Sequence, residues 1–230
     1  KIFVAKNIKT AEAAKVIENT QRDINVAFIN EITKLFKKIN INIFDVLKTA
    51  KTKWNFLNFQ PGFVGGHCIG VDPYYLSYLA KKKKTGSNLI LSGRKVNNDF
   101  PIFLAQYINN CISKRNKILV LGLTFKENVS DLRNTKVLDL IKSLKKKGHK
   151  IFVNDVCAHE NEVKKMNLNL TPLSKKDKYD TIILAVAHDN YKKLNYSFFK
   201  KKLNENEKIF DVKAIWKNKK LSKTIEYIIL

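Results

Sequence analysis

The first 115 residues follow a helical pattern of hydrophobic and polar positions. Between Thr10 and Ile39 no proline or glycine interrupts the chain, and apolar residues recur every three or four positions. This spacing predicts one long helix, with Thr10 as its N-cap. The pattern predicts three further helices, over residues 44–51, 73–83 and 88–115. Whether the last of these is broken at Pro101 stays open, because proline inside a helix removes a backbone hydrogen bond.

The pattern changes at residue 117, where short apolar runs replace the long helical spacing. The runs predict strands over residues 117–123, 150–154, 181–187 and 208–212, with an edge strand over 224–228. An amphipathic helix over residues 135–147, stopped by Gly148, separates the first two. Strands that alternate with helices indicate a parallel α/β sheet. We therefore expect an all-helical domain over residues 1–116 and a Rossmann-like parallel-sheet domain over residues 117–230.

Charge and cysteine content narrow the function classes. The net charge is +24, but the lysine runs follow predicted helices, arginines are few, and no aromatic–basic repeat accompanies them. We therefore expect no specific nucleic-acid partner. We also expect no membrane association, since no apolar run approaches ~18 residues. The three cysteines are widely spaced and predict no disulfide framework and no metal site. A reducing cytoplasm is the expected location, and a start without methionine suggests a longer protein.

A glycine-dense loop over residues 61–76 carries the strongest chemical signal. Gly65 and Gly66 let backbone amides approach a ligand closely, because glycine has no Cβ. Cys68 follows, near the predicted start of the helix at Pro73, where a thiol becomes a better nucleophile. A tight turn with a buried structural cysteine is the alternative. Asp72 is either a reactive carboxylate or the N-cap of that helix.

Four segments together resemble the UDP-glucose/GDP-mannose dehydrogenase family. They read AEAAKVIEN (11–19), GGHCIGVDP (65–73), SGRKVNND (92–99) and GLTFKEN…DLRNT (122–135), and they follow one another in family order. Their wording is most similar to the branch that oxidises UDP-N-acetylhexosamines. Members of this family have an N-terminal NAD-binding domain, a central helical domain that dimerises through its long helix, and a C-terminal UDP-sugar-binding domain. The chain resembles the last two only, since it contains no GxGxxG fingerprint.

The resemblance implies roles for four residues in a four-electron oxidation of a C6 alcohol by NAD. Cys68 would be the nucleophile that forms a thiohemiacetal and then a thioester. Lys15 and Asn19 stand four apart on the long helix and would stabilise the oxyanion; from spacing alone they are ordinary surface positions. Asp72 would orient water for thioester hydrolysis.

The resemblance also implies binding residues for a UDP sugar and for the cofactor. The substrate residues that it implies are Phe63, Val64, Gly65, Gly66, Phe125, Lys126 and Arg94. Arg94 either contacts substrate or only braces the long helix. Gly70 and Arg133 are the cofactor-binding residues that the resemblance implies.

Two functions follow from these expectations. The first is part of an NAD-dependent UDP-sugar 6-dehydrogenase of surface polysaccharide synthesis, homodimeric through its long helix and inactive without the NAD domain. The alternative is a truncated, non-catalytic module that dimerises and binds a UDP sugar.

Overall fold

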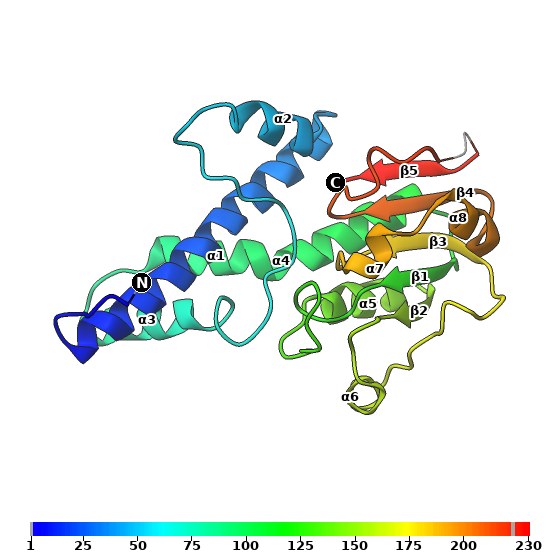
Figure 1. Ribbon diagram of the computed structural model, residues 1–230. Coiled ribbons are helices and arrows are strands. Elements are labelled where there is room, and N and C mark those ends of the chain that lie inside the picture. Colours follow the sequence, from blue (N-terminus) through cyan, green and yellow to red (C-terminus); the bar gives the residue numbers. More distant parts are fainter. Residues whose placement is uncertain (1, 222–223) are drawn as a thin grey trace.

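Four helices form the first part of the molecule in the computed structural model, which describes residues 2–221 and 224–230. They are α1 (Ile8–Lys38), α2 (Ile43–Ala50), α3 (Asp72–Lys82) and α4 (Asn88–Cys111). α1 crosses α4, and α3 packs beside both (Figure 1). The N-terminal end of α1 lies far from the sheet in this view. None of the helices in the described part of the chain has both the length and the apolar character to cross a membrane.

A parallel five-stranded sheet forms the second part. Its strands are β1 (Lys117–Leu121), β2 (Lys150–Asn154), β3 (Tyr179–Leu184), β4 (Leu203–Asp211) and β5 (Glu226–Ile229). They lie in the order β2-β1-β3-β4-β5, all parallel. The predicted fold class is confirmed, and β5 is an edge strand as expected. The order reverses between β1 and β3, which is where parallel α/β sheets bind ligands, beyond the carboxyl ends of the strands.

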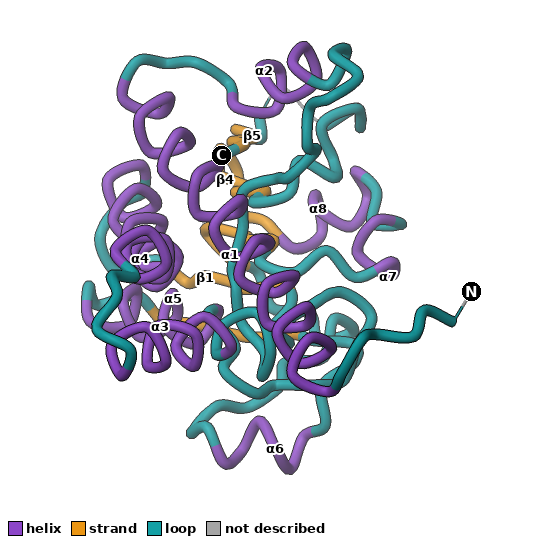
Figure 2. The backbone as a smooth tube through the Cα atoms, turned by 90° about the vertical axis from the view of Figure 1, so that its left-hand side faces the viewer, coloured by secondary structure: helices purple, strands orange, loops and turns teal. Residues whose placement is uncertain are grey.

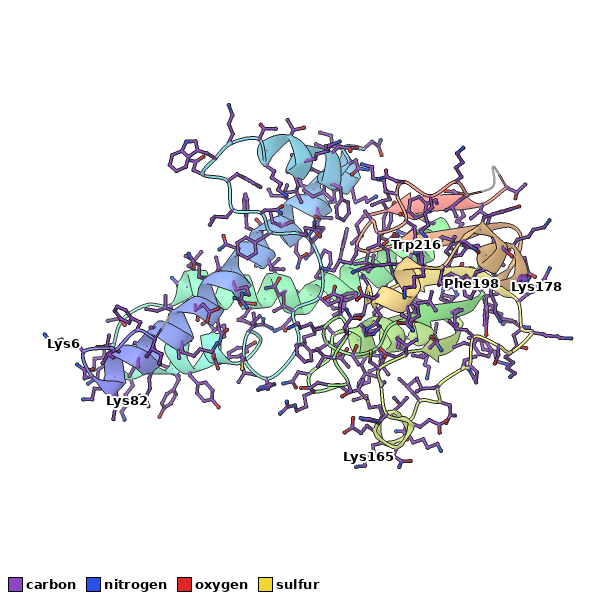
Figure 3. All side chains as sticks on the ribbon, in the orientation of Figure 1. Lys6, Lys82, Lys165, Lys178, Phe198 and Trp216 are labelled. Atoms are coloured by element: carbon purple, nitrogen blue, oxygen red, sulfur yellow. The ribbon has the colours of Figure 1, made fainter. Side chains whose placement is uncertain are left out.

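Side chains of alternate strand residues fill a core on each face of the sheet. Ile118 and Val120 of β1 pack with α4 and with α5 (Val137–Lys146) on one face. Leu119 and Leu121 face the opposite side, where Trp216 is fully buried. Phe199 lies edge-on to Trp216, with ring centroids 4.9 Å apart. The side chains around Trp216 and Phe198 fill this second layer in Figure 3.

Three short helices were not predicted from the sequence. They are α6 (Glu160–Lys165), α7 (Asp189–Lys192) and α8 (Tyr196–Lys202). α6 lies between β2 and β3 in the chain and projects from the main body (Figure 2). α7 and α8 lie on the side of the sheet opposite α4 and α5. Each is shorter than two turns, so periodicity gives little signal for it.

One detail of the predicted helices is wrong, and the question left open at Pro101 is answered. Asn7, and not Thr10, caps α1: its side-chain oxygen accepts from the Thr10 backbone N–H at 2.9 Å. Pro101 does not break α4, which continues through it. The missing hydrogen bond costs about 3 kcal/mol, and the completely buried Phe100 and Ile108 on either side keep the helix packed.

α4 joins the two parts of the molecule. Its second half contributes Phe100, Leu104 and Ile108 to the core that covers one face of the sheet. The first half bonds to α1 through Arg94 and Asn97. A division of the chain at residues 116 and 117 therefore stays a prediction, because the core of the second part includes side chains from before that point.

The predicted first and third strands end earlier than expected, and the difference shapes the site. β1 stops at Leu121, since Gly122 takes a φ of +91°. A Cβ at Gly122 would lie 2.5 Å from the Val186 side chain. The backbone N–H groups of Ala185 and Val186 both donate to the Leu121 carbonyl. Residues 122–128 and 185–187 thus form loops at the carboxyl edge of the sheet.

Candidate active site

A cavity of about 170 Å³ lies where the carboxyl edge of the sheet meets the helical part. The strand arrows in Figure 1 point toward this junction. Loops after β1, β3 and β4, the glycine loop and α1 all contribute to its wall. Its lining includes Arg22, Phe63, Val64, Gly65, Phe125, Lys126, Glu127 and Lys213. The cavity therefore occupies the switch point of the sheet.

Asn30 of α1 fixes the start of the glycine loop. Its side-chain oxygen accepts from the Gly62 N–H at 2.9 Å, and its amide donates to the Gly62 carbonyl at 2.9 Å. The same amide donates to Asn97 of α4, also at 2.9 Å. All three partners are buried. The long helix thus sets the position at which the loop enters the site.

The two central glycines of the loop are required by the close approach of Phe125. Gly66 has a φ of +83°, and a Cβ there would lie 2.8 Å from the Phe125 ring. A Cβ at Gly65 would lie 2.7 Å from the Asn134 carbonyl. The Gly66 N–H donates to the Arg133 carbonyl at 3.2 Å. The glycine loop and the loop after β1, which the sequence singled out separately, are therefore packed together.

The structure brings three of the four expected catalytic residues together. Asn19, which is buried on α1, donates to the Asp72 carboxylate at 2.6 Å. The Asp72 N–H donates to the Cys68 carbonyl at 2.8 Å, so Cys68 lies one turn before α3. Cys68 is half-buried and free. Asp72 is not an N-cap: Val71 takes that position without a side-chain cap, and Asp72 is the first helical residue.

Lys15 is not brought into this group. It lies on the exposed side of α1, and its ammonium pairs with Glu18 at 3.2 Å. Glu18 also pairs with Arg22 at 2.6 Å. Lys15 and Asn19 share a helix face in sequence terms, but the short ion pair directs the Lys15 side chain along the surface.

Lys213 is a cavity residue that the sequence reasoning missed. It follows the end of β4, and its ammonium donates to the Pro61 carbonyl at 3.1 Å. Burial lowers the pKa of Lys213 below its ordinary value, and the nearby Glu127 carboxylate opposes this only in part. Its position directly after the predicted strand at 208–212 was the available signal, since binding groups gather at carboxyl ends of parallel strands. Lys126 faces the same cavity from the loop after β1.

Arg94 is buried and paired with a residue of the long helix. It is 2% exposed and forms an ion pair of 2.5 Å with Asp23 of α1. A second nitrogen donates to Asn98 at 2.7 Å. Burial raises the pKa of Asp23, although Arg94 and Asn97 act to lower it. Arg94 also borders a second cavity, of about 500 Å³, that Gly70 lines as well.

Arg133 is exposed and is not among the residues that line the first cavity. Its guanidinium makes three hydrogen bonds to the Asp131 carboxylate, at 3.0, 3.0 and 2.6 Å. These hydrogen bonds lower the pKa of Asp131. Arg133 lines a separate cavity of about 620 Å³ together with His159 and Glu162 of the α6 region. The two residues expected to bind the cofactor, Gly70 and Arg133, therefore lie on different cavities.

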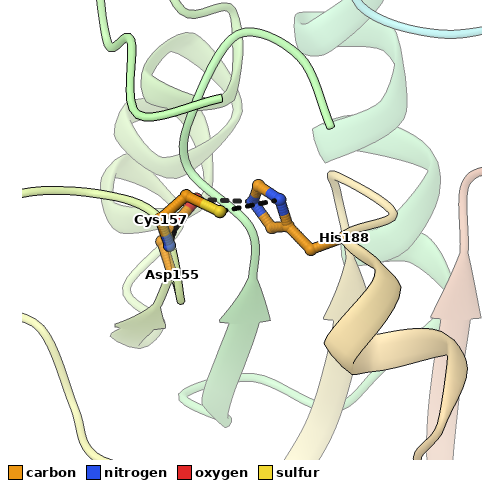
Figure 4. Close-up of side chains that lie close together, drawn as sticks. All are labelled: Asp155, Cys157 and His188. Atoms are coloured by element: carbon orange, nitrogen blue, oxygen red, sulfur yellow. Dashed lines mark hydrogen bonds and ion pairs between the residues drawn. The ribbon is translucent and has the colours of Figure 1, made fainter. Parts of the chain in front are cut away.

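One group of donors could be considered for a metal ion. The side chains of Asp155, Cys157 and His188 lie within 4.8 Å of one another (Figure 4). The carboxylate contacts His188 Nε2 at 3.1 Å, whereas the Cys157 sulfur lies 3.6 Å from Nδ1. The carboxylate already accepts from the Leu123 and Thr124 N–H groups, and His188 Nδ1 accepts from the Asn128 N–H. The arrangement favours a hydrogen-bond network over a metal centre.

Two sequence-family models match most of the chain. Residues 9–99 match the central domain of the UDP-glucose/GDP-mannose dehydrogenase family. Residues 119–218 match the UDP binding domain of the same family.

Curated relatives and solved structures agree with these matches. Protein CapL of Staphylococcus aureus is 44% identical over 93% of this chain and 52% of its own length. A UDP-N-acetyl-D-glucosamine 6-dehydrogenase of Salmonella typhi is 39% identical over the same shares. The structure of the UDP-N-acetyl-mannosamine dehydrogenase Cap5O from S. aureus has a TM-score of 0.77 at 29% identity, covering 97% of this chain and 51% of that one. The chain spans about half the length of the relatives that it matches.

Proposed function

This chain belongs to the UDP-glucose/GDP-mannose dehydrogenase family, and we propose that it is the central and UDP-binding part of an NAD-dependent 6-dehydrogenase. Its substrate would be a UDP-N-acetylhexosamine, because a relative that aligns with 93% of the chain is named a UDP-N-acetyl-D-glucosamine 6-dehydrogenase. The uronate product would serve surface polysaccharide synthesis. The observation that carries the proposal is the contact of Asn19 with Asp72, beside Cys68. It joins the long helix to the glycine loop at one point.

Cys68 would act as the nucleophile. Its thiolate adds to a C6 aldehyde, forming a carbon–sulfur bond and an oxyanion. The Asn19 amide would donate to that oxyanion. After oxidation to the thioester, water would attack beside Asp72, and the thiolate would leave as the carboxylate forms. Lys15 would have to leave Glu18 to take part.

NAD would supply the two oxidations, but the described residues do not by themselves form a site for it. There is no GxGxxG sequence, and Gly70 and Arg133 line separate cavities. At the end of β2, where dinucleotide-binding folds place an acid for the ribose, Asp155 is fully buried and bonded to protein N–H groups. We therefore assign NAD no contact within the described residues.

The cavity at the switch point would hold the UDP moiety. Lys126, Lys213 and Arg22 supply positive charge to its wall, which suits a diphosphate. Phe63 and Phe125 supply apolar surface, and the backbone of Gly65 can approach a ligand without a side chain in the way. Lys213 starts with a lowered pKa and a single carbonyl partner, so an incoming anion would stabilise its charge.

Calorimetric titration with UDP tests this proposal. We expect one UDP per chain, with affinity at least about tenfold weaker after Lys126→Ala or Lys213→Ala, since a hydrogen bond to a charged group contributes about 1.5–3 kcal/mol. Lys178→Ala is the control, because Lys178 lies at the far side of the sheet (Figure 3). No binding, or equal losses in all three variants, would refute the assignment of this cavity.

We also propose that the chain forms a homodimer through α1. This helix exposes Ile17, Phe28 and Leu35, which are 58%, 60% and 50% accessible. Sedimentation should give a dimer that Phe28→Asp converts to a monomer. A monomer in the unaltered chain would exclude it.

A further inference from the structure

The segment that follows β1 carries two proposed substrate contacts on a short, irregular stretch of backbone. Residues 123–128 include Phe125 and Lys126, and neither lies in a helix or strand. Asn128 has a φ of +58°, so the backbone reverses there. Such a loop needs support from elsewhere if Lys126 is to keep one position at the cavity.

Asp155 holds the beginning of this segment. One carboxylate oxygen accepts from the Leu123 N–H at 2.5 Å and from the Thr124 N–H at 2.9 Å. The other oxygen accepts from the N–H groups of Cys157 and Ala158, at 2.8 and 2.9 Å. Burial disfavours the charge of Asp155, but its hydrogen bonds from His188 and from the backbone outweigh this and keep its pKa at about 2.

His188 holds the end of the segment and is itself held by Asp155. Its Nδ1 accepts from the Asn128 N–H at 2.9 Å, which places the ring proton on Nε2. Nε2 then donates to Asp155 at 3.1 Å (Figure 4). The Asn128 side chain accepts in turn from the Asp189 N–H at 3.0 Å. Both His188 and the Asp155 side chain are completely buried.

We propose that Asp155 and His188 are positioning residues for the UDP sugar, which act through the loop that carries Phe125 and Lys126. The two side chains bond to both ends of the 123–128 segment and to each other, so the residues between those ends have a fixed backbone. Neither side chain lines the cavity itself. The inference rests on the proposed function, since Lys126 is assigned there to the diphosphate.

The test compares His188→Leu with His149→Leu in the full 230-residue chain. His149 is a matched control: it is 5% exposed, its Nδ1 accepts from the Asn116 N–H at 3.3 Å, and its Nε2 pairs with Asn109 at 3.2 Å. It precedes β2 and therefore lies at the opposite end of the sheet. UDP affinity is measured by calorimetry, and thermal denaturation reports the folding of each variant.

We expect His188→Leu to weaken UDP binding about tenfold, because it removes the hydrogen bond that holds Asn128 and the one that holds Asp155. We expect His149→Leu to leave UDP binding unchanged. A second readout separates positioning from general stability. If His188 acts through Lys126, the double variant His188→Leu/Lys126→Ala should bind UDP no more weakly than Lys126→Ala alone. Should His188→Leu unfold, His188→Gln, which can replace one of the two bonds, should show a smaller loss.

Unchanged UDP affinity in folded His188 variants, or losses that add to that of Lys126→Ala, would overturn the positioning role. If the unaltered chain binds no UDP, the proposed function fails instead. Trypsin cleavage after Lys126 then decides the inference, because it should be faster in His188→Leu than in the His149→Leu control. Equal cleavage rates would refute the proposal that His188 holds the 123–128 segment.

Discussion

Replacement of Arg94 by methionine tests whether this residue braces the long helix. Arg94 and Asp23 are 2% and 0% exposed, and their ion pair measures 2.5 Å. Methionine fills much of the same volume but removes the charge. Asp23 would keep only Asn97 as a side-chain partner, at 2.7 Å, and its second oxygen already has no hydrogen-bond partner.

The expected loss of folding stability is large because the buried Asp23 carboxylate is left without its partner. Removal of a single partner from such a pair costs about 3–5 kcal/mol, mostly through the stranded charge. Burial already raises the pKa of Asp23, and Arg94 is the strongest of the groups that lower it. In the variant that pKa rises further, so the folded state binds a proton more tightly than the unfolded state. Stability should then fall as pH rises above the ordinary carboxyl range and recover toward acid.

Urea denaturation at pH 5 and pH 8 measures both effects. Arg94→Met should be less stable than the unaltered chain at pH 8, by several kcal/mol, and closer to it at pH 5. Arg22→Met is the control, since its pair with Glu18 is about half exposed on both sides and should contribute below about 1 kcal/mol. Equal stability of the two variants, or a loss independent of pH, would refute the bracing role.

Three further predictions concern the site. Gly66→Ala should destabilise the chain by about 1–3 kcal/mol in urea denaturation, because its φ is +83° and its Cβ would meet the Phe125 ring; Gly86→Ala, with nothing within 4 Å, should not. UDP binding should take up protons as pH rises toward 10.5, because the diphosphate raises the lowered pKa of Lys213. Calorimetry in buffers of different ionisation enthalpy measures this uptake. If the uptake persists in Lys213→Met, Lys213 does not bind the diphosphate. The pKa of Asp155 is about 2 in the folded chain against 3.8 in the unfolded chain, so its carboxylate should contribute about 2 kcal/mol to the free energy of unfolding. This contribution is present above pH 3.8 and is lost as pH falls below it. The same dependence of stability on acid pH in Asp155→Asn would contradict this.

Local patterns predicted the elements of this fold well where a single element determines them. The strand at 150–154 was placed correctly because its apolar run is short and bounded by polar residues. The parallel arrangement followed from the alternation of strands with helices. The glycine loop was singled out because its residue types carry chemistry whatever the surrounding fold is.

Contacts between distant residues could not be predicted in the same way. Asp23 and Arg94 are 71 positions apart, and Lys213 and Pro61 are 152 apart. A lysine after a strand or an aspartate within a helix looks ordinary until the fold shows what it faces. The polar network of Asp155 and His188 likewise depends on β2 and β3 lying on either side of β1, which only the sheet order establishes.

Alkylation of the cysteines tests most directly whether Cys68 is a prepared nucleophile beneath a UDP sugar. Iodoacetamide labelling of the chain, quantified at each cysteine by mass spectrometry, gives three rates in one experiment. We predict that Cys68 reacts faster than Cys111 and Cys157. Burial raises the pKa of the Cys157 thiol, which lowers its thiolate fraction. UDP-N-acetylglucosamine should slow only Cys68. Equal rates at all three positions, unaffected by the nucleotide sugar, would contradict the account and favour a non-catalytic module.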